Sequence, residues 1–126
     1  MVAEDSEQWA MAAARAADAK LGVDTVVLDV GDVLAITDAF VITSGTNARQ
    51  VRSIAEDVEA QLTEAGGPKP VRVEGLDDAR WILMDYGAFV VHVFLDDARR
   101  FYELERLWSD VPRLDWRGAH EAEVGS

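Results

Sequence analysis

The feature that most constrains the fold is a pair of short apolar runs, Trp81–Met84 and Phe89–Phe94. Runs of this length that are rich in Val, Ile and Phe are typical of buried strands. Between them Gly87 can supply the positive φ that a two-residue hairpin turn at Tyr86-Gly87 needs. Such a turn predicts three facing pairs across the hairpin: Asp85 with Ala88, Leu83 with Val90, and Trp81 with His92.

The two faces of this hairpin differ in chemistry, because side chains alternate between faces along a strand. One face is purely apolar and carries Ile82, Met84, Phe89, Val91 and Val93. The other face carries an indole, a carboxylate and an imidazole as well as aliphatic groups, from Trp81, Leu83, Asp85, Val90 and His92. We expect the first face to pack in the core and the second to carry the function.

The residues after the hairpin predict one short helix that ends near Trp108. Asp96 and Asp97 precede it, where carboxylates suit the positive end of the helix dipole. Helical spacing predicts an inward side with Phe101, Leu104 and Trp108, and an outward side with Arg99, Tyr102 and Arg106. An exposed Tyr between two Arg has the composition of an interface. The alternative is that the Tyr side chain lies along the edge of the sheet.

The other predicted elements complete a single α/β domain with a mixed five-stranded sheet flanked by helices. They are a helix capped by Ser6 with Ala10, Ala13, Ala14, Ala17 and Leu21 inward, strands at 25–30, 39–43 and 70–74, and a helix with Val51, Ile54, Ala55, Val58, Leu62 and Ala65 inward. After Asp110 the periodicity is lost. We therefore expect a domain of residues 1–110 and a largely disordered extension, 111–126, with at most one local contact from Trp116.

The charge balance narrows the choice of partner. The chain carries 24 acidic and 12 basic residues, a formal net charge of −12. Because nucleic-acid affinity comes largely from Lys and Arg, we expect little direct nucleic-acid contact and no binding to an anionic membrane. A basic protein is the natural complement, although the acidity could also serve solubility alone. The N-terminus lacks a signal-peptide pattern, and the absence of Cys agrees with a reducing cytoplasm.

An enzymatic reading is the alternative to a binding surface. Ser44-Gly45-Thr46 lies between a predicted strand and a helix, a geometry that can hold a phosphate, and Asp38 and Asp85 could supply carboxylates. However, no Gly-rich nucleotide motif is present, and Ser44 or Thr46 could simply cap the helix. In the predicted register, Asp85 and His92 lie ~13 Å apart, too far for an acid–base pair. We therefore predict no catalytic residue, metal ligand or cofactor.

Five segments resemble the ribosomal silencing factor family, which is also called Iojap-like. They are Asp38–Thr46 (DAFVITSGT), Glu74-Gly75, Trp81–Asp85 (WILMD), His92–Phe94 (HVF) and Arg100–Trp108 (RFYELERLW). Their order and spacing agree over roughly Asp5 to Asp110. The Ala-rich first helix matches loosely, and the segment after Asp110 lies outside the shared motifs.

This resemblance implies a nucleotidyltransferase-like fold without enzymatic activity, in a cytoplasmic protein. It implies binding to the large ribosomal subunit, mainly through large-subunit ribosomal protein fourteen. That binding would block joining of the small subunit and lower translation when nutrients are scarce, and the free protein would form a homodimer. The partner-contacting aromatics of the family fall on Trp81 and Tyr102. Together with the neighbouring polar groups, the expected partner-binding residues are Trp81, Tyr102, Asp85, His92, Arg99, Glu103 and Glu105.

Overall fold

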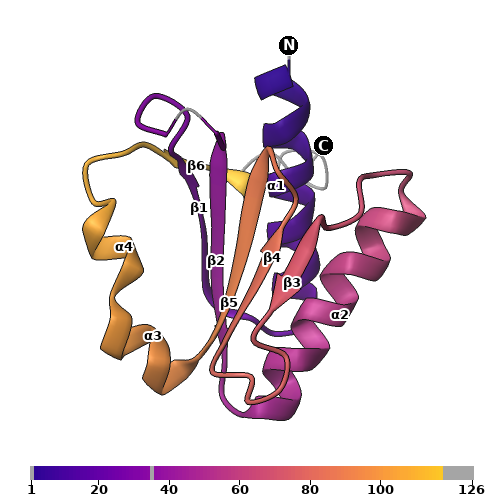
Figure 1. The fold of residues 1–126 in the computed structure, drawn as a ribbon, viewed down its shortest axis with the longest axis vertical. Helices are drawn as coiled ribbons and strands as arrows, with labels where there is room; N and C mark the ends of the chain where they lie inside the picture. The colour runs from indigo at the N-terminus through magenta and orange to yellow at the C-terminus, as the bar shows by residue number, and fades with distance from the viewer. Residues whose placement is uncertain (1, 35, 118–126) are drawn as a thin grey trace.

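The computed structural model of the chain describes residues 2–34 and 36–117 (Figure 1). In chain order its elements are α1 (Val2–Ala19), β1 (Val23–Asp29), β2 (Ala39–Gly45), α2 (Ala48–Glu64), β3 (Arg72–Glu74), β4 (Trp81–Asp85), β5 (Phe89–Leu95), α3 (Asp96–Tyr102), α4 (Leu104–Leu107) and β6 (Arg113–Leu114).

The strands form one mixed sheet in the order β3-β4-β5-β2-β1-β6. β2 and β5 run parallel, and the other neighbouring strands pair antiparallel. The predicted α/β class and mixed sheet are confirmed, whereas the predicted number of five strands is wrong because β6 adds a sixth. β6 has only two residues, too few to show the alternation from which a strand is predicted.

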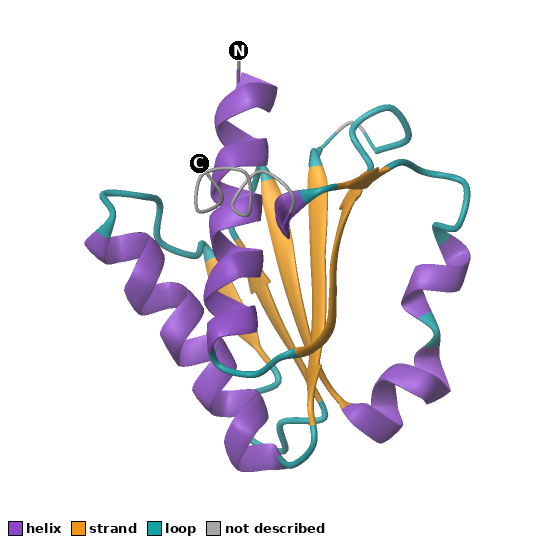
Figure 2. Ribbon diagram, turned by 180° about the vertical axis from the view of Figure 1, so that it is seen from behind, coloured by secondary structure: helices purple, strands orange, loops and turns teal. Residues whose placement is uncertain are grey.

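The helices cover the sheet from both sides, as Figure 2 shows. α1 and α2 pack on one face, where fully buried alanines allow α1 to approach the strands closely (Ala10, Ala13, Ala14 and Ala17). The apolar face of the hairpin packs against these two helices, and its predicted core residues are each at most 1% exposed (Ile82, Met84, Phe89, Val91 and Val93). α3 and α4 lie over part of the other face, where Ala98 packs against β1, β2 and β5.

The predicted hairpin register is wrong by two residues. Trp81 faces Phe94, Leu83 faces His92 and Asp85 faces Val90. The connection is the three-residue segment 86–88 rather than a two-residue turn. In it Gly87 has the expected positive φ of 83°, and its N–H donates to the Asp85 carboxylate at 2.8 Å. Because the shift is an even number of residues, the predicted division between the two faces still holds.

The predicted last helix is broken in two at Glu103, which has a left-handed φ of 48°. Because the prediction assumes one continuous helix from 96 to 108, it is wrong about which way two of the side chains point. Phe101, predicted to point inward, is 75% exposed, whereas Arg99, predicted to point outward, is only 8% exposed. Leu104 and Trp108 do pack against the sheet, as expected.

Smaller corrections concern helix ends. α1 begins at Val2, so Ser6 lies inside it and is buried, and Leu21 is exposed with a left-handed φ of 64°. The cap of α2 is Asn47, whose side chain accepts from the Gln50 N–H at 2.9 Å. Thr46, the alternative cap, is not the capping residue, and its own N–H donates to the Gln50 side chain.

The segment after Asp110 contributes to the fold. β6 pairs with Val27 and Leu28 of β1, and the buried Trp116 donates its indole N–H to the Thr25 carbonyl at 3.1 Å. This contact joins residues 91 positions apart, so the expectation of at most a local contact from Trp116 is wrong. Residues 118–126 of the predicted extension lie outside the described residues, and the proposed domain boundary at Asp110 stays a prediction.

We predict that Trp116→Ala lowers the free energy of unfolding by about 3 kcal/mol, because it removes a buried aromatic ring and its hydrogen bond. Urea denaturation measures this loss. Trp108→Ala, which removes a less buried indole from α4's end, serves as the comparison and should cost less. An unchanged stability of Trp116→Ala would mean that the segment after Asp110 is not part of the cooperative fold.

Candidate functional site

Three aromatic rings gather on the mixed face of the hairpin, beside α3. Trp81 of β4 stacks on Phe94 of β5 with ring centroids 4.8 Å apart, and Tyr102 of α3 lies 4.9 Å from Trp81. Phe94 is fully buried, Trp81 is partly exposed and Tyr102 is 47% exposed. We call Trp81, Phe94 and Tyr102 the aromatic patch. Phe94 forms its floor, and Trp81 and Tyr102 are reachable from solvent.

The imidazole of His92 orients the indole of the aromatic patch through a hydrogen bond. The Trp81 Nε1–H donates to His92 Nδ1 at 3.0 Å, so the neutral imidazole carries its proton on Nε2. Burial lowers the pKa of His92 to about 4, so the ring stays neutral near physiological pH. Within the described part of the chain Nε2 has no hydrogen-bond partner, and the Phe40 ring lies edge-on to the imidazole at 4.9 Å. His92 is thus placed to orient Trp81 rather than to be touched directly.

Asp85 lies on the same face near the hairpin turn. Its carboxylate accepts from the Gly87 N–H and from Arg72, the latter at 3.4 Å. Asp85 lines a mostly apolar groove of about 440 Å³, to which Phe40, Leu83 and Val90 also contribute. The carboxylate therefore stands beside an apolar depression, where a cationic side chain of a partner could reach it.

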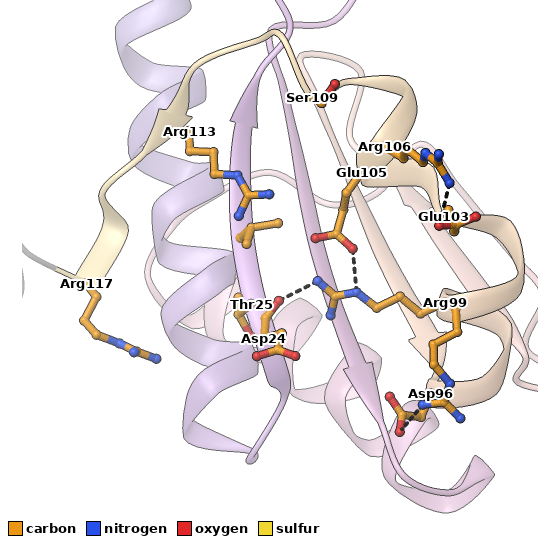
Figure 3. A pocket seen from close by; sticks show the side chains of 12 residues that line it. Asp24, Thr25, Asp96, Arg99, Glu103, Glu105, Arg106, Ser109, Arg113 and Arg117 are labelled. Carbon is orange, nitrogen blue, oxygen red and sulfur yellow. Dashed lines mark hydrogen bonds and ion pairs between the residues drawn. The ribbon is translucent and has the colours of Figure 1, made fainter.

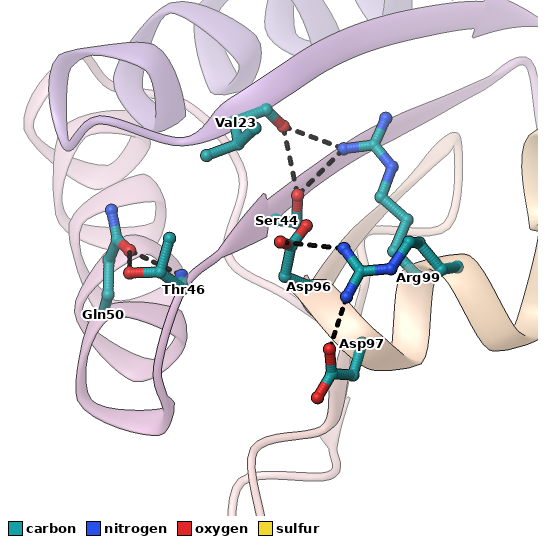
Figure 4. A network of polar contacts seen from close by, with 8 residues as sticks. Val23, Ser44, Thr46, Gln50, Asp96, Asp97 and Arg99 are labelled. Atoms are coloured by element: carbon teal, nitrogen blue, oxygen red, sulfur yellow. Dashed lines mark hydrogen bonds and ion pairs between the residues drawn. The ribbon is translucent and has the colours of Figure 1, made fainter.

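Arg99 is fixed by hydrogen bonds within the fold. Its guanidinium donates to the Val23 carbonyl at 2.8 Å and to the Ser44 hydroxyl at 3.1 Å (Figure 4). It donates a third hydrogen bond to the Asp24 carbonyl at 2.6 Å. It also donates to Glu105 at 2.9 Å, and this hydrogen bond is the main reason why the pKa of Glu105 is lowered. Both residues were predicted to contact a partner. The structure places them in a largely buried ion pair that fastens α3 and α4 to β1 and β2.

Glu103, the remaining predicted contact residue, is exposed at the break between α3 and α4, and its carboxylate pairs with Arg106 at 3.4 Å. The predicted residues therefore form two groups. Trp81, Tyr102, His92 and Asp85 share one face of the sheet, whereas Arg99, Glu103 and Glu105 lie on the other flank of the helical pair.

The alternative nucleotide site is not assembled. Ser44 is 1% exposed and its hydroxyl is engaged with Val23 and Arg99. Asp38 lies just before β2 and Gly45 at its other end, so about 20 Å of extended strand separates the two. Among the described residues, no group of three or more His, Asp or Glu is arranged to hold a metal ion.

Sequence reasoning missed two aromatic residues of this region. Phe94 has the same parity as His92 along β5, so alternation alone could have placed it beside Trp81. Phe101 was assigned inward by helical spacing, yet it is exposed next to Tyr102, with ring centroids 5.1 Å apart. Because the break at Glu103 ends α3, Phe101 does not share a helical side with Leu104 and Trp108, and no motif in the sequence marks that break.

Comparison with known proteins identifies the family. A family model described as ribosomal silencing factor during starvation matches residues 3–125. The ribosomal silencing factor RsfS of Bacillus subtilis (strain 168) is 42% identical over 103 residues, which cover 82% of this chain and 86% of that protein. The chain belongs to the ribosomal silencing factor family.

More distant relatives and a solved structure agree with this family. The mouse protein named mitochondrial assembly of ribosomal large subunit protein 1 is 33% identical over 88 residues, 68% of this chain and 39% of that protein. A crystal structure of a Chromobacterium violaceum protein superposes with a TM-score of 0.78 at 32% identity, covering 82% of this chain and 86% of that one. The resemblance seen in the sequence is thereby confirmed. No helix among the described residues has the length and apolarity to span a membrane.

We predict that burial of His92 makes the stability of this protein depend on pH. The unfolded imidazole binds a proton with a pKa of 6.5 and the folded one only at about 4, so stability is lost as pH falls from 6.5 towards 4. Between about pH 7 and about pH 4.5, this contributes a loss of roughly 2–3 kcal/mol in the free energy of unfolding. His92→Asn, which keeps an acceptor for Trp81 but does not titrate, should lack it. Urea denaturation at both pH values tests this, and equal pH dependence in the two proteins would contradict it.

We also predict that Arg99→Met destabilises the fold by about 3 kcal/mol, because it leaves Glu105 and two backbone carbonyls without their buried partner. Arg100→Met is the matched control. Arg100 pairs with Asp96 and Asp97 but its side chain is 66% exposed, so its loss should cost less than about 1 kcal/mol. Thermal unfolding of both variants distinguishes the two positions, and equal losses would refute the assigned role of Arg99.

Proposed function

We propose that this protein binds the large ribosomal subunit through large-subunit ribosomal protein fourteen and sterically prevents joining of the small subunit. No bond is made or broken in this mechanism. Membership in the ribosomal silencing factor family supports it, as does the family description, which ties silencing to starvation. The name of the mouse relative, which refers to assembly of the large ribosomal subunit, supports the choice of subunit.

The observation that carries the proposal is the aromatic patch. Aromatic residues with large amphipathic side chains, partly exposed and held in place by their neighbours, often contribute most of the binding energy in protein interfaces. Trp81 is held by His92 and Phe94, so its ring does not need to be ordered when the partner arrives. Tyr102 and the exposed Phe101 extend the apolar area onto α3. The neighbouring groove beside Phe40 and Val90 offers space for an apolar side chain of the partner.

The charge of the chain supports a basic protein as the direct contact. The net charge is −12, and Asp85 stands beside the groove with its side chain 27% exposed. Asp77 and Asp78, in the loop that leads to Trp81, are exposed as well. Complementary charge of this kind speeds and orients the encounter more than it strengthens the complex.

We further propose that the protein acts in the cytoplasm and self-associates. A second copy could cover the same patch when no ribosome is bound, so the homodimer and the ribosome complex would compete. We also propose that the fold has the nucleotidyltransferase-like topology that the resemblance implies, without an enzymatic step.

We expect Trp81→Ala and Tyr102→Ala each to weaken binding to free large subunits about thirtyfold, the loss typical of an aromatic anchor at ~2 kcal/mol. Co-sedimentation with separated large subunits, small subunits and joined ribosomes measures the affinity and its selectivity. The wild-type protein should bind free large subunits alone and should slow subunit joining in a light-scattering assay.

Trp9→Ala is the control, because Trp9 lies on α1, on the opposite side of the sheet. Circular dichroism verifies that all three variants are folded. If both patch variants bind as tightly as the wild type, the patch is not the contact. If the wild type binds but subunit joining proceeds at its normal rate, the steric mechanism is wrong.

A further inference from the structure

A second candidate site lies on the side of α3 and α4 that faces away from the aromatic patch. A cleft of about 1070 Å³ opens between these helices and the edge of the sheet formed by β1 and β6. Figure 3 shows the side chains around it, with Arg113 pointing in from the C-terminal segment and Arg99 and Glu105 from the helices. The aromatic patch lies on β4, β5 and α3, so the helical pair stands between the patch and the cleft.

The cleft gathers the positive charge of an acidic protein. Five of the chain's 12 basic residues line it, against four of its 24 acidic residues. The basic residues come from three separate segments of the chain: Arg99 and Arg100 from α3, Arg106 from α4, and Arg113 and Arg117 from the C-terminal segment. Chance placement in a chain of this composition would favour carboxylates two to one, so arginine is enriched in the cleft relative to the chain as a whole.

These arginines differ in how freely they can bind a ligand. Arg99 is buried, and its guanidinium donates hydrogen bonds to the backbone carbonyls of Val23 and Asp24. Arg106 and Arg117 are 78% and 56% exposed in single ion pairs with Glu103 and Asp18. Exposed pairs of this kind are worth little and can open when a stronger anion arrives.

Arg113 is the most available. It is exposed, makes no hydrogen bond or ion pair within the described part of the chain, and lies near enough to Glu105 to act on it electrostatically. The acidic groups that face the cleft are Asp24, Asp96, Glu103 and Glu105. Glu105 is already matched by Arg99, and Asp96 and Glu103 by Arg100 and Arg106, which leaves Arg113 and the Asp24 carboxylate as the two charged groups of the cleft that form no ion pair among the described residues.

We infer that this cleft binds phosphate groups of an RNA backbone, and that in the proposed complex it contacts ribosomal RNA beside the protein docked on the aromatic patch. Arg is suited to this role because its planar guanidinium binds phosphate through two parallel hydrogen bonds. The net charge of −12 excludes extensive RNA binding, but a few phosphates at one local cluster are compatible with it. This inference rests on the proposed function only for the source of the RNA.

The test is the salt dependence of binding to large subunits. Arg106→Gln/Arg113→Gln removes two cleft charges without touching the buried Arg99. Arg49→Gln/Lys69→Gln removes two exposed charges outside the cleft and is the matched control. We expect the cleft variant to bind about tenfold or more weakly at low salt, and the slope of log K against log salt to fall by about 1.4–1.8, the value for two lost phosphate contacts. The control should keep the wild-type slope.

A cleft variant with wild-type affinity and slope would overturn the inference and leave the proposed function intact. Should the wild type fail to bind large subunits, the proposed function fails, and a ribosome-free measurement decides the inference. In that measurement, a short uridine oligonucleotide is titrated into the full chain and the Arg Nε–H resonances are followed by NMR. Shifts at Arg106 and Arg113 but not Arg49 support RNA binding. The inference is overturned if neither Arg106 nor Arg113 shifts, or if they shift with polyglutamate but not with the oligonucleotide.

Discussion

The placement of α3 and α4 depends on the guanidinium of Arg99. These helices follow β5 and pack on the sheet through apolar side chains, of which Ala98 is fully buried and Leu104 and Trp108 are partly buried. Arg99 adds hydrogen bonds to the carbonyls of Val23 and Asp24 and to Ser44, and it joins α4 through Glu105. A charged side chain can be this deeply buried only because its donors are paired. Both candidate surfaces lie against the helical pair that it fixes.

The two surfaces use this helical pair in different ways. On one flank Tyr102 completes an apolar patch whose indole is fixed by His92. On the other flank Arg106 and Arg113 line a cleft that is enriched in arginine relative to the rest of this acidic chain. A ribosomal surface is made of basic protein and anionic RNA, so a protein that presents a carboxylate-flanked patch beside an arginine-lined cleft has a complement for each. Neither surface requires bond-making chemistry.

The sequence predicts the parts of this structure that depend on local periodicity. Strand alternation predicts the apolar face of the hairpin and the position of Trp81 on the mixed face. Helical spacing predicts the close packing of the Ala-rich side of α1. The failures have a common physical cause, which is that long-range contacts override local pattern. Arg99 turns inward because backbone carbonyls far away in the chain accept its protons, and β6 forms because β1 offers an unpaired edge. Neither partner could be read from the residues themselves.

We propose that the aromatic patch contacts a protein at the subunit-joining face of the large subunit. A cryo-electron microscopy structure of this protein bound to free large subunits is the decisive measurement. We expect the rings of Trp81 and Tyr102 to be covered by a basic ribosomal protein, with the body of the domain occupying space that the small subunit needs. A complex in which both rings face solvent, or in which the domain lies away from the joining face, would contradict it.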